Sequence, residues 1–315
     1  MKDYTMKCLI IDPMFPGIQE LLNNIGLPSD HFPEITPAKV LEIISQYEGL
    51  ILRSKMKIDI DFLEKATKLK FIARAGAGLD QIDEDYLQKR QIKLFNAPEG
   101  NRDAVGEHAI GMLLSLLNKL HTADLEVRNK QWRREANRGY EIKGKTVGII
   151  GYGHMGKAFA KRLRGFECKT IAYDINTDVI TNSDATMVDM ETLFNEADIL
   201  SFHIPLTSVS KGMVNNVFLD NFKKPIYLIN TARGPVVPFA SVKYGLEKGI
   251  ITAAGLDVLE NEKLETLTPA QLADFEYLSK SPKVLLSPHV GGWTFESYQR
   301  INEVLVDKIK KTYFV

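Results

Sequence analysis

Cysteine is scarce in this chain of 315 residues, which contains only Cys8 and Cys168. Both lie in or beside apolar stretches that resemble strands. Two such residues form neither the disulfide framework of a small secreted protein nor a zinc site. We therefore expect a protein of a reducing compartment, the cytoplasm, with no bound metal.

An excess of charge of either sign is also absent, since 40 Lys and Arg residues balance 40 Asp and Glu residues. This balance argues against nucleic acid or an anionic membrane as a partner. No apolar run approaches the roughly 20 residues that a membrane span requires. The first residues, Met1 to Tyr4, lead into a short strand without the apolar segment of a secretory signal. We expect a soluble protein.

A glycine-rich turn is the most informative motif of the chain. It reads Gly151-Tyr152-Gly153-His154-Met155-Gly156 and directly follows an apolar run at 146–150. A helix-like pattern comes next, and Asp174 ends the following strand, 18 residues after Gly156. Glycines at this spacing let the backbone approach a pyrophosphate at a helix N-terminus, and the acid can bind ribose hydroxyls. The motif predicts a dinucleotide site, although a tight turn with a surface Asp is the plainer alternative.

The residues after Asp174 bear on which dinucleotide is bound. They are Ile175, Asn176 and Thr177, so no basic side chain follows closely. A ribose 2′-phosphate would therefore meet the Asp174 carboxylate without a compensating charge. The sequence favours NAD over NADP as the cofactor.

Strand-like and helical stretches alternate along the chain, which is typical of parallel α/β domains. A first series of predicted strands lies near 7–11, 49–52, 71–74 and 92–95, and a helix at 37–46 has Thr36 as its cap. A second series lies at 146–150, 169–173, 199–203, 226–230, 252–256 and 284–287. The second series contains the glycine turn, so it is the predicted cofactor domain.

Between the two series, residues 105–120 form a helical run that is apolar on almost every side. Such a helix must be buried on several faces, either within its own subunit or against a second one. The polar segment 129–134 that follows is predicted to be a loop or an arm.

Three further motifs follow predicted strands, where ligands collect in parallel sheets. They are residues 230–234 with Arg233, residues 255–262 with several acids, and residues 287–292 with His289. Arg233 could hold a carboxylate in a planar fork, and His289 could donate a proton while an acid stabilises its charged form. Each residue alone is more often structural. Behind a dinucleotide turn, the set predicts reduction of a 2-keto acid.

With these motifs the sequence resembles the D-isomer-specific 2-hydroxyacid dehydrogenases, and within them the 3-phosphoglycerate dehydrogenases, over essentially the whole chain. The resemblance implies that Arg233 binds and polarises the substrate, His289 is the acid/base, and Glu262 pairs with it. It implies a Rossmann-type doubly wound parallel sheet as the cofactor domain and a smaller flavodoxin-like α/β substrate domain. The implied cofactor-binding residues are Gly151, Gly153, His154, Met155, Gly156, Asp174, His203, Pro205, Thr207, Thr231, Ala232, Asp257 and Gly291.

The family pattern also implies how the chain is divided. Residues 1–97 and 290–315 would form the substrate domain, residues 98–289 the NAD-binding domain, and the cleft would close on ligand binding. Family members are usually dimers built on the long apolar helix, so a homodimer is expected.

The sequence departs from the family pattern after the expected catalytic acid. Lys263 stands where proline is usual, and the stretch up to His289 is somewhat long, so Glu260 is an alternative to Glu262. The chain also stops shortly after its final helix, so the C-terminal regulatory domain of long phosphoglycerate dehydrogenases is not expected.

Two segments bear on the identity of the substrate. Arg53 and Ser54 follow one predicted strand, and Arg74-Ala75-Gly76-Ala77 follow the next. Backbone N–H groups of the glycine segment suit a carboxylate, while Arg53, Ser54 and Arg74 could hold a phosphate. D-3-phosphoglycerate is therefore the first expectation. Glyoxylate, hydroxypyruvate or another small 2-keto acid is the second, and an NAD(H)-sensing binding protein is the alternative of another class.

Overall fold

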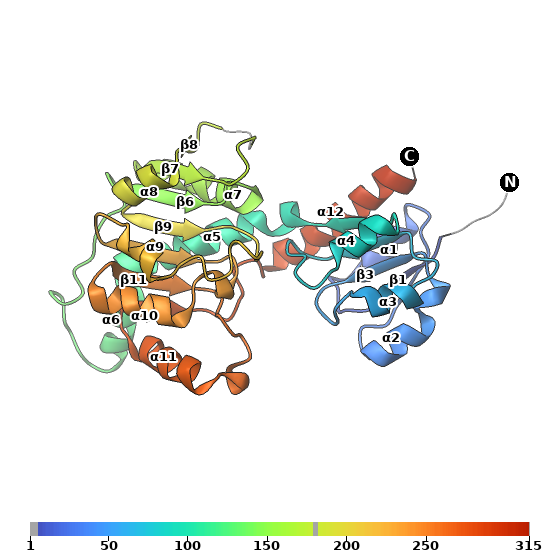
Figure 1. Cartoon of the computed structure of the whole chain (residues 1–315), viewed down its shortest axis with the longest axis horizontal. Helices are drawn as coiled ribbons and strands as arrows, with labels where there is room; N and C mark the ends of the chain where they lie inside the picture. Colours follow the sequence, from blue (N-terminus) through green and yellow to red (C-terminus); the bar gives the residue numbers. More distant parts are fainter. Residues whose placement is uncertain (1–5, 179–181, 315) are drawn as a thin grey trace. The chain divides into compact units, whose positions relative to one another are not determined.

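The chain folds into two compact units in the computed structural model, which describes residues 6–178 and 182–314 (Figure 1). The first five residues, which contributed to the expectation of no secretory signal, lie outside this part. Unit 1 consists of Met1–Asn101 and Trp293–Val315, and unit 2 of Arg102–Gly292. Within the described ranges, no helix is long and apolar enough to cross a membrane.

Unit 1 contains a five-stranded parallel sheet in the order β2-β1-β3-β4-β5. This is the flavodoxin order, so the predicted class of the smaller domain is confirmed. Its strands are β1 (Cys8–Ile10), β2 (Ser29–His31), β3 (Gly49–Leu52), β4 (Phe71–Arg74) and β5 (Lys93–Asn96).

Side chains that alternate along these strands build two separate cores. Leu50 and Leu52 face one side of the sheet, where they pack with α2 (Pro37–Ile43), α3 (Ile60–Lys65) and α4 (Glu84–Lys89). Ile51 faces the other side and packs with α1 (Ile18–Asn23) and α12 (Phe295–Tyr313). Because α12 supplies part of this second core, the C-terminal end of the chain completes unit 1.

Unit 2 contains a seven-stranded parallel sheet in the order β12-β11-β10-β9-β6-β7-β8. From β8 to β11 this is the order of a doubly wound dinucleotide-binding fold, and β12 adds a seventh strand, which confirms the predicted class. The order reverses where β6 lies beside β9. The strands are β6 (Thr146–Ile150), β7 (Lys169–Tyr173), β8 (Thr186–Met187), β9 (Ile199–Phe202), β10 (Ile226–Asn230), β11 (Ile251–Leu256) and β12 (Val284–Leu286).

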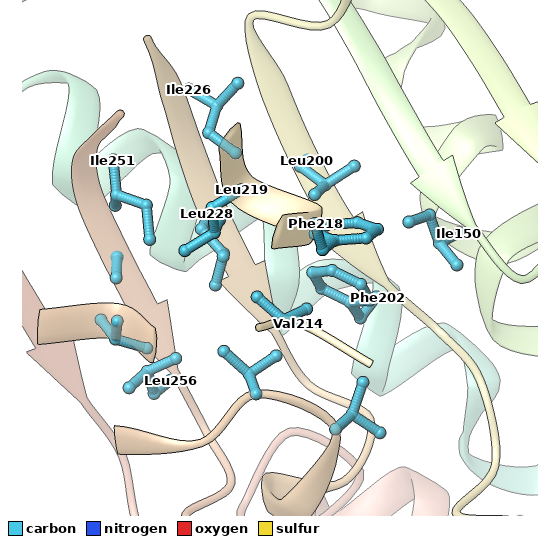
Figure 2. Close-up of a cluster of buried hydrophobic side chains, with 14 of the residues drawn as sticks. Ile150, Leu200, Phe202, Val214, Phe218, Leu219, Ile226, Leu228, Ile251 and Leu256 are labelled. Carbon is cyan, nitrogen blue, oxygen red and sulfur yellow. The ribbon is translucent and has the colours of Figure 1, made fainter. Parts of the chain in front are cut away.

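Helices cover both faces of the second sheet. On one face, Leu200 and Leu228 belong to the cluster shown in Figure 2, which packs against α8 (Met190–Glu196), α9 (Asn216–Asp220), α10 (Phe239–Lys248) and α11 (Pro269–Lys280). On the other face, Ile199 and Ile229 pack against α5 (Pro98–Leu117) and α7 (His154–Leu163). Burial on both faces explains the continuous apolar runs from which these strands were predicted.

Some boundaries differ from the sequence prediction. The long apolar helix α5 begins at Pro98, which suits the first helical position, and ends at Leu117. Lys119 then adopts the left-handed φ of 52°, and a separate helix α6 (Leu120–Arg128) follows. The predicted helix 37–46 is α2 followed by a 3₁₀ turn at Ile44–Gln46, and Thr36 caps it as expected. The strands β2 and β8 escaped prediction because they are edge strands of only three and two residues.

Candidate active site

The glycine turn joins β6 to α7 in unit 2. Gly151 has a φ of 93°, and a Cβ there would lie 2.5 Å from the carbonyl oxygen of His203. A Cβ on Gly156 would lie 2.0 Å from the carbonyl oxygen of Gly151. Gly153 is the N-cap of α7 and provides no side-chain cap. The turn therefore brings bare backbone to the start of α7 and leaves the helix N-terminus to be satisfied from outside.

Asp174 lies directly after β7 and is tied to this turn. Its Oδ2 accepts a hydrogen bond from the backbone N–H of Tyr152 at 2.6 Å, and its Oδ1 accepts one from the N–H of Asn176 at 2.9 Å. Each oxygen keeps a lone pair for a further donor. The acid is thus placed beside the glycine turn with its carboxylate oriented.

Two buried polar atoms near the ends of β9 and β10 have no hydrogen-bond partner among the described residues. They are Nδ1 of His203 and Oγ1 of Thr231. The His203 ring is 9% exposed, packs against Phe159 and has its Nε2 2.9 Å from the hydroxyl of Ser201. Burial lowers the pKa of this imidazole to about 3, so the ring is neutral.

The catalytic histidine that the sequence predicts is paired with an acid. Nδ1 of His289 lies 2.8 Å from Oε1 of Glu262, and both side chains are about half exposed. Glu260, the alternative acid, instead accepts hydrogen bonds from the backbone N–H of Phe239 and the amide of Gln271. The geometry therefore selects Glu262 as the partner of His289.

Arg233 follows β10, the neighbour of β11 in the sheet, and is half-buried. Asn230 fixes the segment around it, because its side chain donates to the carbonyl of Arg233 and accepts from the N–H of Ala232, both at 3.0 Å. Nη1 of Arg233 donates to the carbonyl of Ala232 at 2.7 Å. A Cβ on Gly234 would lie 1.7 Å from the carbonyl oxygen of Leu259, so only glycine fits beside this arginine.

Asp257 follows β11 and is buried, with its side chain 2% exposed. Its Oδ1 accepts from the Ser287 hydroxyl at 2.6 Å and the Val290 N–H at 2.9 Å, and its Oδ2 accepts from the Gly291 N–H at 2.8 Å. Burial alone would raise the pKa of this carboxyl. Hydrogen bonds from His108, Ser287 and the two N–H groups outweigh burial and lower the pKa to about 2.

In unit 1, Arg53 lies after β3 and stacks on aromatic rings. Its guanidinium carbon is 3.8 Å from the ring centroid of Trp293 and 5.0 Å from that of Tyr298. The buried carboxylate of Asp12 accepts the backbone N–H of Arg53 at 2.7 Å. Within the described residues, no acceptor is hydrogen-bonded to the guanidinium N–H groups. Ser54 beside it is exposed.

The glycine segment after β4 is shaped by Arg74. Gly76 has a φ of 147°, and a Cβ there would lie 1.7 Å from Nη1 of Arg74. Its N–H donates to the carbonyl of Arg74, and its carbonyl accepts the N–H of Ala97. The carbonyl of Ala77 accepts from the side chain of Asn96 at 2.8 Å, and the N–H of Ala75 donates to Leu52. The Arg74 side chain therefore lies against Gly76, and any larger residue at position 76 would displace that side chain.

Comparisons with known proteins agree with this geometry. The NAD-binding domain of the D-isomer-specific 2-hydroxyacid dehydrogenases matches residues 110–291. The chain is 33% identical to a hydroxypyruvate reductase of Thermotoga maritima, over 95% of this chain and 96% of that protein. It is 37% identical to a glyoxylate reductase of Thermofilum pendens, over 94% and 87%.

The chain belongs to the D-isomer-specific 2-hydroxyacid dehydrogenase family.

Two further similar proteins act on other 2-hydroxy acids. A D-3-phosphoglycerate dehydrogenase of Archaeoglobus fulgidus is 30% identical over 96% of this chain, which spans 56% of that protein. The crystal structure of a D-lactate dehydrogenase from Aquifex aeolicus with NAD and lactic acid matches 97% of this chain and 95% of its own, with a TM-score of 0.83 and 26% identity. The chain is thus an NAD-dependent D-2-hydroxyacid dehydrogenase, as the sequence predicted.

The residues present in unit 2 fit this dehydrogenase cofactor. The glycine turn offers bare backbone and an uncapped helix N-terminus for the pyrophosphate, and Asp174 has free acceptor capacity for ribose hydroxyls. Thr231 has a buried hydroxyl without a partner in the described part of the chain. A donor or acceptor on a bound dinucleotide would satisfy that group.

Other predicted cofactor residues are placed as follows. His154 is exposed at the start of α7, Met155 is half-buried after it, and Ala232 is buried beside Arg233. Pro205 and Thr207 belong to a turn after β9, in which Ser210 donates to the carbonyl of Pro205 at 2.7 Å. Gly291 lies against Asp257 and His108, because a Cβ there would be 2.8 Å from Oδ2 of Asp257. Contacts of these residues with the cofactor remain predictions.

Sequence reasoning missed several residues of these sites. The rings of Trp293 and Tyr298 stack against the guanidinium of Arg53. The sequence feature that could have indicated this contact was a large aromatic residue, Trp293, directly after two glycines. His108 contacts Asp257, and the signal was a histidine inside an apolar helix. No group of three or more metal-ligating side chains occurs in the part of the chain that the structure describes.

Proposed function

We propose that this dehydrogenase interconverts D-3-phosphoglycerate and 3-phosphohydroxypyruvate with NAD, the reaction that opens serine biosynthesis. The stacked guanidinium of Arg53 carries the proposal. Trp293 and Tyr298 hold its face, so its N–H edges remain for an acceptor. A planar, oriented fork of donors suits a dianionic phosphate.

Arg233, Glu262 and His289 would act on the C2 end of the substrate. Arg233 would bind the substrate carboxylate and polarise the C2 oxygen. Its positive charge would stabilise the negative charge that develops on this oxygen in the transition state. His289 would take the hydroxyl proton during oxidation and return it to the carbonyl oxygen during reduction. Glu262, 2.8 Å from Nδ1, would keep the ring oriented and stabilise its charged form. A bound NAD, held at the glycine turn and by Asp174, would supply the hydride chemistry at C2.

NAD is proposed over NADP because of the residues around Asp174. Its carboxylate is oriented by two backbone N–H groups, and Ile175, Asn176 and Thr177 provide no positive charge beside it. A 2′-phosphate would be repelled there.

A second candidate is reduction of hydroxypyruvate or glyoxylate by the same residues. It is favoured by the identity of the chain to the hydroxypyruvate reductase of T. maritima (33%) and the glyoxylate reductase of T. pendens (37%), against 30% to the A. fulgidus phosphoglycerate dehydrogenase.

The test is the rate of NADH oxidation with 3-phosphohydroxypyruvate, hydroxypyruvate, glyoxylate and pyruvate. We expect the highest kcat/KM for the phosphorylated compound. Arg53→Ala should lower that value about 10- to 100-fold, as for loss of one charged anchor, and change the value for hydroxypyruvate far less. Lys57→Ala, in the same loop and exposed, is the matched control. Equal losses for both substrates would refute the phosphate-binding role and leave the second candidate. Binding of NADH without turnover of any of these acids would favour the third alternative, an NAD(H)-sensing binding protein.

We further propose a homodimer, located in the cytoplasm. Leu120, Leu125 and Trp132 are 56%, 61% and 79% exposed along α6 and the segment after it. Large apolar side chains gathered on one segment favour a partner surface. Light scattering after gel filtration should give twice the chain mass, and Leu125→Asp should reduce it to one chain. A monomer in the unaltered protein would refute the proposal.

A further inference from the structure

A second cluster of polar side chains includes Asp257, whose backbone carbonyl accepts the N–H of His289. Nε2 of His108, on α5, is 3.0 Å from Oγ of Ser287 and 3.3 Å from Oδ1 of Asp257. The same Ser287 hydroxyl lies 2.6 Å from Oδ1 of Asp257. A serine, a histidine and an aspartate thus meet inside unit 2, outside the pair formed by His289 and Glu262.

The donor and acceptor roles open to these groups argue against a nucleophilic triad. The ionised carboxylate of Asp257 only accepts, so the Ser287 hydroxyl donates to it. Oγ of Ser287 can then only accept from His108, which requires a hydrogen on Nε2. The histidine nitrogen that faces the serine is therefore a donor and cannot take its proton. Ser287 is not activated as a nucleophile, and the cluster has to act on Asp257.

Asp257 in turn holds the backbone of the catalytic histidine. Three consecutive N–H groups donate to this one residue: His289 to its backbone carbonyl at 2.7 Å, Val290 to Oδ1 at 2.9 Å, and Gly291 to Oδ2 at 2.8 Å. His289 adopts the left-handed φ of 56°. For a residue with a Cβ that conformation costs about 1–2 kcal/mol, so it has to be stabilised by its surroundings.

We propose that His108 and Ser287 are positioning residues for the reaction: they fix the Asp257 carboxylate and, through it, the strained backbone of His289. The inference rests on the proposed acid/base role of His289. Without the two side-chain donors, only the N–H groups of Val290 and Gly291 hold the carboxylate, and His289 can leave its left-handed conformation. The imidazole would then move away from Glu262 and from the substrate.

The substitutions follow from the geometry. In His108→Gln the amide nitrogen can replace Nε2 as a donor, whereas His108→Leu keeps the bulk and removes the donor. Ser287→Ala removes the middle of the chain of hydrogen bonds. His121→Leu is the matched control, since Nε2 of His121 contacts the carbonyl of Pro282 outside the cluster.

We expect His108→Leu and Ser287→Ala to lower kcat on the order of 10- to 100-fold, as a small misplacement of a reacting group does. His108→Gln and His121→Leu should retain most of the activity. Equal kcat values for His108→Leu and His121→Leu would overturn the proposal, as would a loss in His108→Gln as large as in His108→Leu.

A cavity of about 240 Å³ beside the cluster allows a sharper experiment. It is lined by His108, Gly111, Met112, Leu285, Leu286 and Ser287. Exogenous imidazole could enter it and replace the missing ring in His108→Gly. We expect saturable recovery of kcat with imidazole in His108→Gly, and none in His108→Leu or Ser287→Ala. Absence of recovery in a folded His108→Gly protein with low activity would count against positioning through a hydrogen bond.

Hydrogen exchange separates this inference from the proposed function. The amides of residues 289–291 should be protected in the unaltered protein and exposed in His108→Leu and Ser287→Ala, and this readout needs no substrate. If His289→Ala keeps full turnover, the acid/base assignment of His289 fails. The exchange data then still test whether His108 and Ser287 hold the 289–291 backbone through Asp257. If His289→Ala is inactive but protection and kcat survive in His108→Leu, only the positioning inference fails.

Discussion

The buried imidazole of His203 makes the stability of unit 2 depend on pH. Burial lowers its pKa from 6.5 to about 3, so the folded protein keeps the ring neutral over the range in which the unfolded chain protonates it. Stability from this group is complete above pH 6.5 and is lost as the pH falls from there towards 3. Each pH unit within that window costs about 1.4 kcal/mol, so lowering the pH from 8 to 5 should cost about 2 kcal/mol.

The assay is urea unfolding followed by far-UV circular dichroism at pH 8 and pH 5. His203→Gln removes the titrating group and keeps an amide nitrogen that can bond to Ser201, so its free energy of unfolding should lack this 2 kcal/mol of pH dependence. His154→Asn, which replaces an exposed ring, is the control and should keep it. An identical pH dependence in His203→Gln and the unaltered protein would refute the reasoning.

Three shorter predictions concern the cofactor turn and the catalytic pair. Gly156→Ala should destabilise unit 2 by about 1–3 kcal/mol and weaken NADH binding, because the new Cβ would lie 2.0 Å from the Gly151 carbonyl oxygen; unchanged melting and affinity would contradict this. Asp174→Ser should raise kcat/KM for NADPH relative to NADH, and an unaltered ratio would remove Asp174 from cofactor choice. Glu262→Gln should lower kcat far more than NADH affinity, whereas Glu260→Gln should mainly lower the melting temperature; the reverse result would exchange the two acids.

Local patterns were enough to predict both domain classes. Continuous apolar runs predicted the buried parallel strands, and the glycine turn with Asp174 predicted the cofactor domain. The short edge strands β2 and β8 lack such a pattern, since an edge strand is held by backbone pairing with one neighbour. The break after Leu117 also escaped prediction, because the left-handed residue there is Lys119 and not the glycine that usually marks such a helix end.

The residue types at the strand ends, Arg233, Glu262 and His289, were readable from the sequence because their chemistry and spacing are local. The family pattern named Glu262 as the acid that faces the histidine, but only the folded loop excludes Glu260, which bonds to Phe239 instead. Likewise, Trp293 reaches Arg53, and His108 reaches Ser287, across 240 and 179 residues of sequence. Such contacts depend on how distant segments pack, so the sequence by itself determined the fold class and the reaction type, and the tertiary structure decided which residues hold the reacting groups in place.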